Sequence, residues 1–274
     1  MMKTYPRVLT IAGSDSGGGA GIQADIKAIS ATGSYAASAI TAVTVQNTLG
    51  VLAVHNVPVE IVSGQIEAVL QDIGADAVKI GMLSSAGLVR TVARTLLALD
   101  VTQIVLDPVM VSTSGHRLLD EDAIGVLTGE LAPLARVITP NIPEAEILLG
   151  EELSAEEDLP GAARRLSERL SSRRKVSVLM KAGHLRDENL VDFFYNAEQD
   201  RIVELPSRRM HSPNTHGTGC TLSSAFASYL AQGLELDSAA RAAKDYIARA
   251  IESGAEYSIG HGHGPVDHFW VLEK

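Results

Sequence analysis

Short apolar runs alternate along most of this chain with segments whose apolar residues recur at helical spacing, and this alternation restricts the fold more than any other feature. The runs predict buried strands, and the segments between them predict helices. Repeated alternation is typical of a parallel sheet joined by right-handed helical crossovers. The expected strands are 7–12, 36–45, 51–57, 77–80, 103–106, 136–139 and 176–180, with an antiparallel edge pair at 190–195 and 201–205; the expected helices are 22–32, 58–73, 85–99, 144–149, 151–174 and 221–230.

The composition suits this fold and a single domain. Hydrophobic residues make up 46% of the 274 residues but aromatic residues only 4%, so Ala, Val, Ile and Leu must fill the core. Parallel sheets that are covered by helices on both faces are built from such residues. Since α/β folds of about 250 residues commonly form one unit, we expect one α/β domain over residues 1–274.

Charge and cysteine content argue against several classes of partner. The formal net charge of −10 disfavours nucleic acid or an anionic membrane surface. Residues 28–59 contain no Asp, Glu, Lys or Arg, but polar residues and glycines interrupt any apolar span of about 18 residues. The run 8–12 is too short for a signal peptide. One cysteine allows no intrachain disulfide, so we expect a soluble, cytoplasmic protein.

Polar side chains follow the expected strands at the points where the strands end. Because ligands of open parallel sheets bind beyond the carboxyl ends of the strands, these residues are expected to meet at one rim. Loops that are polar for other reasons would scatter such groups over both ends of the sheet. The residues at the rim are Asp15, Gln46, Met82, Asp107, Asn141 with Glu144, and Lys181.

A glycine-rich turn at 214–220 precedes the expected helix at 221–230 and contains the only cysteine, Cys220. Unpaired N–H groups and the positive end of the helix dipole make such a turn an anion site. The same place lowers the pKa of a thiol. The turn alone leaves a second interpretation open, a loop closure around a small buried thiol.

A second glycine-rich segment, 13–21, separates the first strand from the first helix. Ile22 stands where the dinucleotide fingerprint requires its third glycine, and no Gly-Lys-Ser/Thr of a P-loop occurs in the chain. The loop still allows a flat ligand or a phosphate to approach the backbone closely.

The rim and the turn together fit phosphoryl transfer from a nucleotide, in which positioning and positive potential supply most of the catalysis. Backbone N–H groups of Gly217, Thr218, Gly219 and Cys220 would bind the transferred group, and the Cys220 thiol would be the general base. Asp107 and Glu144 could hold Mg²⁺ directly or through water, although each could equally serve as a helix cap or loop acceptor. Lys181 could neutralise nucleotide phosphates. The spacing of His211, His261, His263 and His268 does not support a zinc site.

Several motifs in this order are similar to those of one enzyme family. They are Leu9-Thr10-Ile11-Ala12-Gly13-Ser14-Asp15, then Gly18-Gly19-Ala20-Gly21-Ile22-Gln23-Ala24-Asp25, Lys79-Ile80-Gly81-Met82-Leu83, Asp107-Pro108-Val109-Met110, Thr139-Pro140-Asn141-x-Pro143-Glu144, Asn214-Thr215-His216-Gly217-Thr218-Gly219-Cys220-Thr221, and the tail from Gly260 to Phe269. Across almost its whole length the chain resembles the bacterial hydroxymethylpyrimidine/phosphomethylpyrimidine kinases of the ribokinase-like superfamily.

The resemblance implies a three-layer αβα sandwich with a mostly parallel central sheet and a small β flap. It implies ATP- and Mg²⁺-dependent phosphorylation of 4-amino-5-hydroxymethyl-2-methylpyrimidine and then of its monophosphate, which supplies the pyrimidine half of thiamine, and it implies a homodimer. By similarity, Gly13, Asp25, Gln46, Met82 and Val109 would bind the pyrimidine, Asn141, Lys181 and Thr215 would bind ATP, and Asp107 and Glu144 would bind the metal.

Two departures from the family pattern affect these expectations. An extra glycine, Gly17, is expected to loosen the first loop, and Ala182 replaces a frequent glycine.

Residues 113–116 are expected to form a flap that excludes water.

Pyridoxal kinase is the nearest competing interpretation, because its substrate is also a flat heteroaromatic ring with one primary alcohol. Two further interpretations stay open at this point. One is a non-catalytic binding protein on the same scaffold, and the second is a hydrolase with Cys220 as nucleophile and His216 as base.

Overall fold

The computed structural model describes residues 4–111, 118–153, 158–183 and 189–272. Its centre is a nine-stranded sheet in the order β3-β2-β1-β4-β5-β6-β7-β8-β9. The strands are β1 (Arg7–Asp15), β2 (Tyr35–Asn47), β3 (Gly50–Asn56), β4 (Ala77–Ile80), β5 (Ile104–Leu106), β6 (Val137–Ile138), β7 (Ser177–Met180), β8 (Asn189–Asn196) and β9 (Arg201–Arg208). Neighbouring strands from β2 to β7 are parallel, and β3, β8 and β9 pair antiparallel with the strand before them. The sheet is therefore mostly parallel, as predicted.

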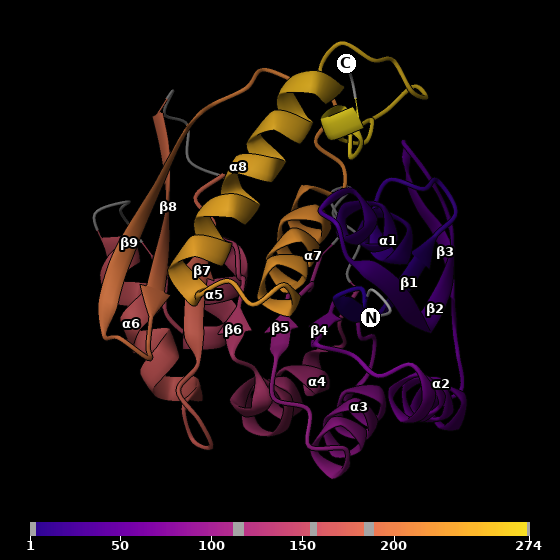
Figure 1. The fold of residues 1–274 in the computed structure, drawn as a ribbon, viewed down its shortest axis with the longest axis vertical. Coiled ribbons are helices and arrows are strands. Elements are labelled where there is room, and N and C mark those ends of the chain that lie inside the picture. The colour runs from indigo at the N-terminus through magenta and orange to yellow at the C-terminus, as the bar shows by residue number, and fades with distance from the viewer. Residues whose placement is uncertain (1–3, 112–117, 154–157, 184–188, 273–274) are drawn as a thin grey trace.

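Helices cover both faces of this sheet, so the molecule has three layers (Figure 1). One face packs against α1 (Gly21–Ala31), α7 (Thr218–Ala231) and α8 (Leu236–Gly254), with Phe194 and Phe226 in contact edge to face. The other face packs against α2 (Val59–Asp72), α3 (Ala86–Ala98), α4 (Glu121–Val126), α5 (Ile142–Leu149) and α6 (Leu159–Leu170). Strands such as β4 and β7 are buried along their whole length, which explains why their sequences are mostly apolar, with Lys79 and Ser177 as the polar exceptions.

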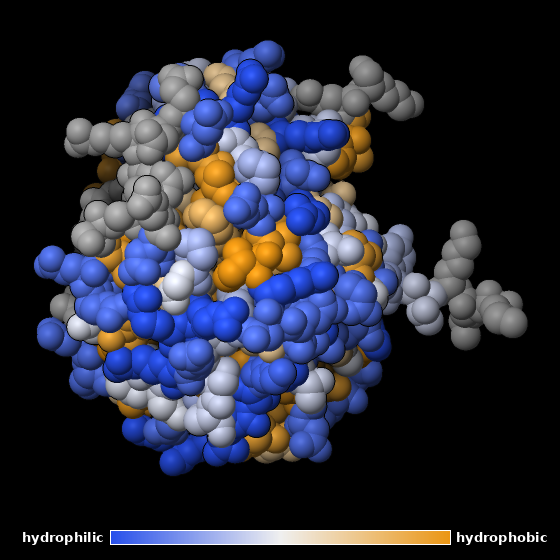
Figure 2. Space-filling view, turned by 90° about the vertical axis from the view of Figure 1, so that its left-hand side faces the viewer, coloured by the Kyte–Doolittle hydropathy of each residue, from blue (hydrophilic) through white to orange (hydrophobic). Residues whose placement is uncertain are grey.

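The two edges of the sheet differ in polarity. On β9, the exposed positions include Arg201, Glu204, Pro206 and Arg208, which discourage pairing with another chain. Figure 2 views this side of the molecule, which is largely hydrophilic with a group of apolar side chains near its middle. On the opposite edge, the β2–β3 hairpin exposes several large apolar side chains: Val43, Val45, Leu49 and Leu52.

The sequence-based boundaries hold for most strands and fail in particular places. The helix expected over 151–174 is shorter in the described residues, because α6 begins at Leu159, with Pro160 in its first turn, and ends at Leu170. The helix expected from residue 221 begins at Thr218, so that the glycine turn forms its first turn. The expected flap at 113–116 lies outside the described residues. Helix α8 and the helical segments between Glu121 and Leu134 had no sequence-based prediction.

No helix within the described ranges is both long enough and apolar enough to cross a membrane.

Candidate active site

A cavity of about 750 Å³ opens at the carboxyl ends of the parallel strands. Its wall contains every candidate site residue but one. From the pyrimidine set it contains Gly13, Gln46, Met82 and Val109; from the nucleotide and metal sets it contains Asn141, Lys181, Thr215, Asp107 and Glu144; and from the turn it contains Gly217, Thr218, Gly219 and Cys220. The structure thus brings together residues that are up to about two hundred positions apart in the sequence.

Asp25 is the exception, because it does not line the cavity. Its carboxylate is completely buried, with Oδ1 and Oδ2 at 2.8 and 2.9 Å from Lys79 Nζ. Thr10 and Ser224 donate further hydrogen bonds to it at 2.6 and 2.8 Å. The expectation that Asp25 contacts the pyrimidine therefore has to be corrected: all of its partners are groups of the protein.

The glycine turn sits at the start of α7 and lines the cavity. Gly217 precedes the helix with φ +80°, and a Cβ atom there would lie 1.8 Å from the carbonyl oxygen of Gly19. Only glycine fits this position, since both the conformation and the contact exclude a side chain. Within the described part of the chain, no group accepts a hydrogen bond from the N–H of Gly219 or Cys220, as is usual in the first turn of a helix. These two N–H groups can therefore donate to an anion.

The loop at 13–21 is tied to this turn by one carboxylate. Asp15 accepts hydrogen bonds from the N–H groups of Gly17, Gly19 and Ala20 at 2.7, 3.0 and 2.8 Å. Its Oδ2 also lies 2.9 Å from Nε2 of His216, which comes from the glycine turn. Burial alone would raise the pKa of Asp15, but His216 and the amides outweigh it and lower the pKa. The extra glycine, Gly17, thus has a hydrogen-bond partner within the loop.

Gln46 joins the same network from β2. Its Oε1 lies 3.1 Å from Thr44 Oγ1, and its Nε2 lies 3.3 Å from His216 Nε2. On the other side of the loop, Met82 limits the space above Gly13, where a Cβ would lie 3.1 Å from its sulfur. These contacts form a narrow, partly apolar end of the cavity, suited to a flat ring.

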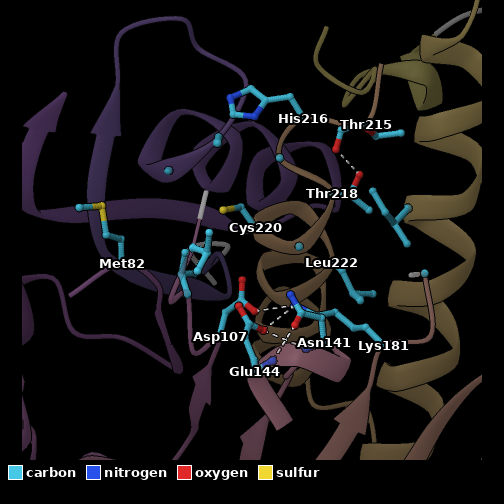
Figure 3. Close-up of a pocket in the computed structure, with 18 of the residues that line it drawn as sticks. Met82, Asp107, Asn141, Glu144, Lys181, Thr215, His216, Thr218, Cys220 and Leu222 are labelled. Carbon is cyan, nitrogen blue, oxygen red and sulfur yellow. Dashed lines mark hydrogen bonds and ion pairs between the residues drawn. The ribbon is translucent and has the colours of Figure 1, made fainter. Parts of the chain in front are cut away.

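Two carboxylates and one lysine lie together at another part of the wall (Figure 3). Lys181 Nζ is 2.9 Å from Asp107 Oδ1 and 3.9 Å from Glu144 Oε2. Burial alone would raise the pKa of Asp107, but Lys181 and Lys79 outweigh it and lower the pKa. Burial raises the pKa of Glu144 to about 7, against the effect of Lys181. One lysine thus only partly compensates the two acids, and the group can accept a further positive charge.

Asn141 and Glu144 also have a local structural role. They form a capping box at the start of α5, in which Asn141 Oδ1 accepts from the N–H of Glu144 and Glu144 Oε2 accepts from the N–H of Asn141, both at 2.9 Å. The interpretation of Glu144 as a capping residue therefore holds, and the carboxylate remains beside Lys181 and the metal candidate Asp107.

The thiol of Cys220 forms part of the cavity wall (Figure 3). At the neighbouring Gly219, a Cβ atom would lie 3.3 Å from Lys181 Nζ and 3.5 Å from Asp107 Oδ2. Burial raises the pKa of Cys220 to about 11, an effect larger than the opposing influence of Lys79. The lowered pKa that the helix start alone predicted is therefore wrong. The missing information was how far the surrounding elements bury Cys220, which is only partly exposed at the cavity.

Two contributors to the site had no role assigned from the sequence. Asp15 was placed at the rim but not recognised as the acceptor that organises the loop. Lys79 was part of a motif only. A sequence signal for it exists, because a lysine inside the apolar run 77–80 must find a buried partner.

Comparisons with known proteins identify the family of this chain. The family model described as phosphomethylpyrimidine kinase matches residues 15–267. The chain is 48% identical over 261 residues to the hydroxymethylpyrimidine/phosphomethylpyrimidine kinase of Rhizobium meliloti, covering 95% of this chain and 96% of that protein. It is 49% identical over 272 residues to the thiamine biosynthesis bifunctional protein ThiED of Geobacter sulfurreducens, covering 98% of this chain but 54% of that protein's length.

A solved structure has the same fold. The ADP complex of Bacillus subtilis pyridoxal kinase superposes with a TM-score of 0.88 at 34% identity, covering 99% of this chain and 100% of that one. The fold is thus the ribokinase-like three-layer sandwich. The family match extends over nearly the whole chain, and the chain belongs to the phosphomethylpyrimidine kinase family.

Proposed function

We propose that this enzyme transfers the γ-phosphoryl group of ATP to the hydroxymethyl oxygen of 4-amino-5-hydroxymethyl-2-methylpyrimidine, and then phosphorylates the monophosphate to the diphosphate for thiamine biosynthesis. The main support is that one cavity is lined at one end by groups suited to a flat ring and at the other by an anion site with a lysine and two carboxylates. Nearly full-length identity of 48% with a kinase of that name supports the same substrate.

The pyrimidine would occupy the end of the cavity formed by Gly13, Gln46, Met82 and Val109. The Met82 sulfur packs against Gly13, where a Cβ atom would lie 3.1 Å from it, and it would offer the ring an apolar contact at this end of the cavity. The amide of Gln46 offers a donor and an acceptor, which suits the ring nitrogen and amino group of an aminopyrimidine.

ATP would extend from the glycine turn toward Asn141, Thr215 and Lys181. The free N–H groups of Gly219 and Cys220 would bind the γ-phosphoryl oxygens, and Lys181 would offset their charge. As the substrate oxygen bonds to the γ-phosphorus, its proton passes to the thiolate sulfur of Cys220. The bond between the γ-phosphorus and the β–γ bridging oxygen breaks, and ADP leaves with the electron pair.

Asp107 and Glu144 fit a magnesium ion. Both are carboxylates at the nucleotide end of the cavity, and together they exceed the positive charge that Lys181 provides. No group of three His, Cys, Asp or Glu side chains arranged to hold a metal occurs in the described ranges, but Mg²⁺ needs few protein ligands because it keeps several waters. When bound, the ion would neutralise charge on the nucleotide phosphates.

The experiment that tests this proposal is an ATP-coupled assay with three substrates: the pyrimidine alcohol, its monophosphate and pyridoxal. Turnover of both pyrimidines, with kcat/KM for pyridoxal at least about tenfold lower, is the expected result. Preference for pyridoxal without turnover of the monophosphate would instead assign the chain the activity named for its structural relative.

We further propose that the enzyme acts as a homodimer in the cytoplasm. The exposed apolar side chains of the β2–β3 edge support an interface there, with Leu52 exposed by 74%. The single cysteine is compatible with a reducing compartment.

A further inference from the structure

A buried ion pair lies beneath the cavity and is not needed by any step described above. Lys79 on β4 and Asp25 on α1 are both fully buried, with Nζ at 2.8 and 2.9 Å from the two carboxylate oxygens. Burying such a pair gains little stability over apolar packing, whereas removing one partner is strongly destabilising. Stability alone is therefore a weak reason for charges at this place.

Two helices fix the position of this pair relative to Cys220. Gly21 begins α1, and Cys220 lies in the first turn of α7. Four residues further along each helix, Ser224 donates to Asp25 at 2.8 Å. Because residues four apart share one helix face, the ion pair lies one helical turn below the thiol.

Lys79 lies at the cavity wall, although its side chain is fully buried. It lines the same wall as Cys220, and its ammonium extends along β4 to Gly81, where a Cβ atom would lie 2.8 Å from Nζ. Asp25 holds this ammonium and does not itself reach the cavity. The positive end of the pair is therefore the end nearer the reacting groups.

Building on the proposed function, we propose that Lys79 is a positioning residue for phosphoryl transfer, a fixed positive charge beneath Cys220 that favours the thiolate over the thiol. Asp25 holds Lys79 in place and limits the strength of its field. The charged groups that act on the sulfur are Asp25 from α1, Lys79 from β4, Asp107 after β5 and Lys181 after β7.

The effects of these charged groups on the pKa of Cys220 agree in sign with the proposal. Burial makes the largest contribution and raises the pKa of Cys220; of the charged groups, Lys79 has the greatest effect and lowers it, while Asp25 and Asp107 raise it. Burial alone would lower the pKa of Lys79, but Asp25 outweighs this effect and raises it, so the lysine stays charged.

The test compares the wild type with the double variant Lys79→Met/Asp25→Asn by the pH dependence of alkylation with iodoacetamide. Cys220 is the only cysteine, so mass spectrometry of the whole chain reports this thiol alone. The double variant removes both buried charges, so that neither is left unpaired, and the amide that Asp25→Asn introduces can keep hydrogen bonds to Thr10 and Ser224. Loss of tertiary structure is monitored by near-ultraviolet circular dichroism.

We expect the alkylation profile of the double variant to shift to higher pH than that of the wild type, because Lys79 has a larger effect on the sulfur than Asp25 has in the opposite direction. A separation of one pKa unit corresponds to about a tenfold difference in alkylation rate below both pKa values. We also expect kcat at pH 8 to be about tenfold lower in the double variant than in the wild type, with KM values within about twofold.

Coincident alkylation profiles of the wild type and the double variant would overturn the proposal, even if kcat falls, because the pair would then act only in folding. If the double variant does not fold, Lys79→Gln/Asp25→Asn takes its place, and an unshifted profile has the same meaning. Alkylation requires no substrate. Its outcome is therefore independent of which alcohol the enzyme phosphorylates, and the three-substrate assay can fail without affecting it.

Discussion

The thiol of Cys220 is subject to two opposing influences at the residue scale. Its place in the first turn of α7 and the nearby Lys79 favour the thiolate, but the surrounding elements remove water, and burial raises the pKa to about 11. At neutral pH, the free enzyme therefore holds a thiol, and only a small fraction is in the form that can accept the substrate's proton.

This pKa predicts a rising pH profile. The active form is deprotonated, so its fraction increases with pH until the pH reaches the thiol pKa; kcat/KM for the pyrimidine alcohol should increase by about tenfold per pH unit between about pH 7.5 and 9.5. Cys220→Asp should flatten this rise, because a carboxylate is ionised at lower pH. Steady-state rates at each pH provide the measurement, and a flat wild-type profile would show that Cys220 is not the base.

Gly217 is a second residue at which one additional atom, a Cβ, is expected to have a large effect. Gly217→Ala would place a Cβ in the left-handed region and 1.8 Å from the Gly19 carbonyl oxygen. Gly33→Ala is the matched control, since its φ is +97° but nothing lies within 4 Å of the added atom. We expect about 1–2 kcal/mol of destabilisation for the control and at least about 2 kcal/mol more for Gly217→Ala, together with loss of turnover.

Urea unfolding and steady-state kinetics measure these two effects. Equal losses of stability in the two variants would mean that the loop at 13–21 moves away from the turn without cost, and that the close approach of the two glycine segments is not required.

At the scale of elements, α5 combines a structural and a functional role in its first turn. Asn141→Ala removes the cap of α5 and should cost about 1 kcal/mol of stability, whereas Asn141→Asp keeps a side-chain acceptor for the Glu144 N–H. If Asn141 also binds ATP, both variants should raise the KM for ATP, and the added negative charge should have the larger effect. A KM that stays at the wild-type value in both variants would confine Asn141 to capping.

The elements themselves show what a sequence can predict. Strand β4 occupies the predicted residues 77–80, because a run that is apolar almost throughout is typical of a strand buried on both faces. The helix predicted over 151–174 was too long, because charged residues continue the helical pattern on both sides of α6 without belonging to it. Strand β1 continues beyond the predicted residue 12 to Asp15, with a register shift between Ala12 and Ser14 that no local pattern indicates.

At the scale of the whole molecule, the sequence predicts that polar residues at the strand ends meet at one rim of the sheet. It does not predict which side chains from distant segments of the chain contact one another. The polarity of strand ends predicted that Gln46, Met82, Asp107, Glu144 and Lys181 meet, because strand direction fixes that result. The pairing of Asp25 with Lys79 and of Asp15 with His216 depends on how α1 and α7 pack side by side, which spacing along the chain does not encode. The raised pKa of Cys220 has the same origin.

The two edges of the sheet differ in polarity, and this difference leads to a prediction about the oligomeric state. Leu52→Lys should convert the expected dimer into a monomer, because a charge on the apolar β2–β3 edge would have to be buried. Leu97→Lys is the control, since Leu97 is also exposed but lies on α3. Light scattering coupled to size-exclusion chromatography measures the mass, and a Leu52→Lys variant that remains dimeric would place the interface elsewhere.

The central claim is that Cys220 accepts the alcohol's proton beside the anion turn, and the two phosphorylation steps test it most directly. The monophosphate needs no base, because its phosphate group is already largely ionised above its second pKa of about 6. In Cys220→Ala, we therefore expect kcat for the pyrimidine alcohol to fall by at least about 100-fold, while kcat for the monophosphate stays within about fivefold of the wild type. Equal losses in both steps, or no loss in the first, would contradict the account.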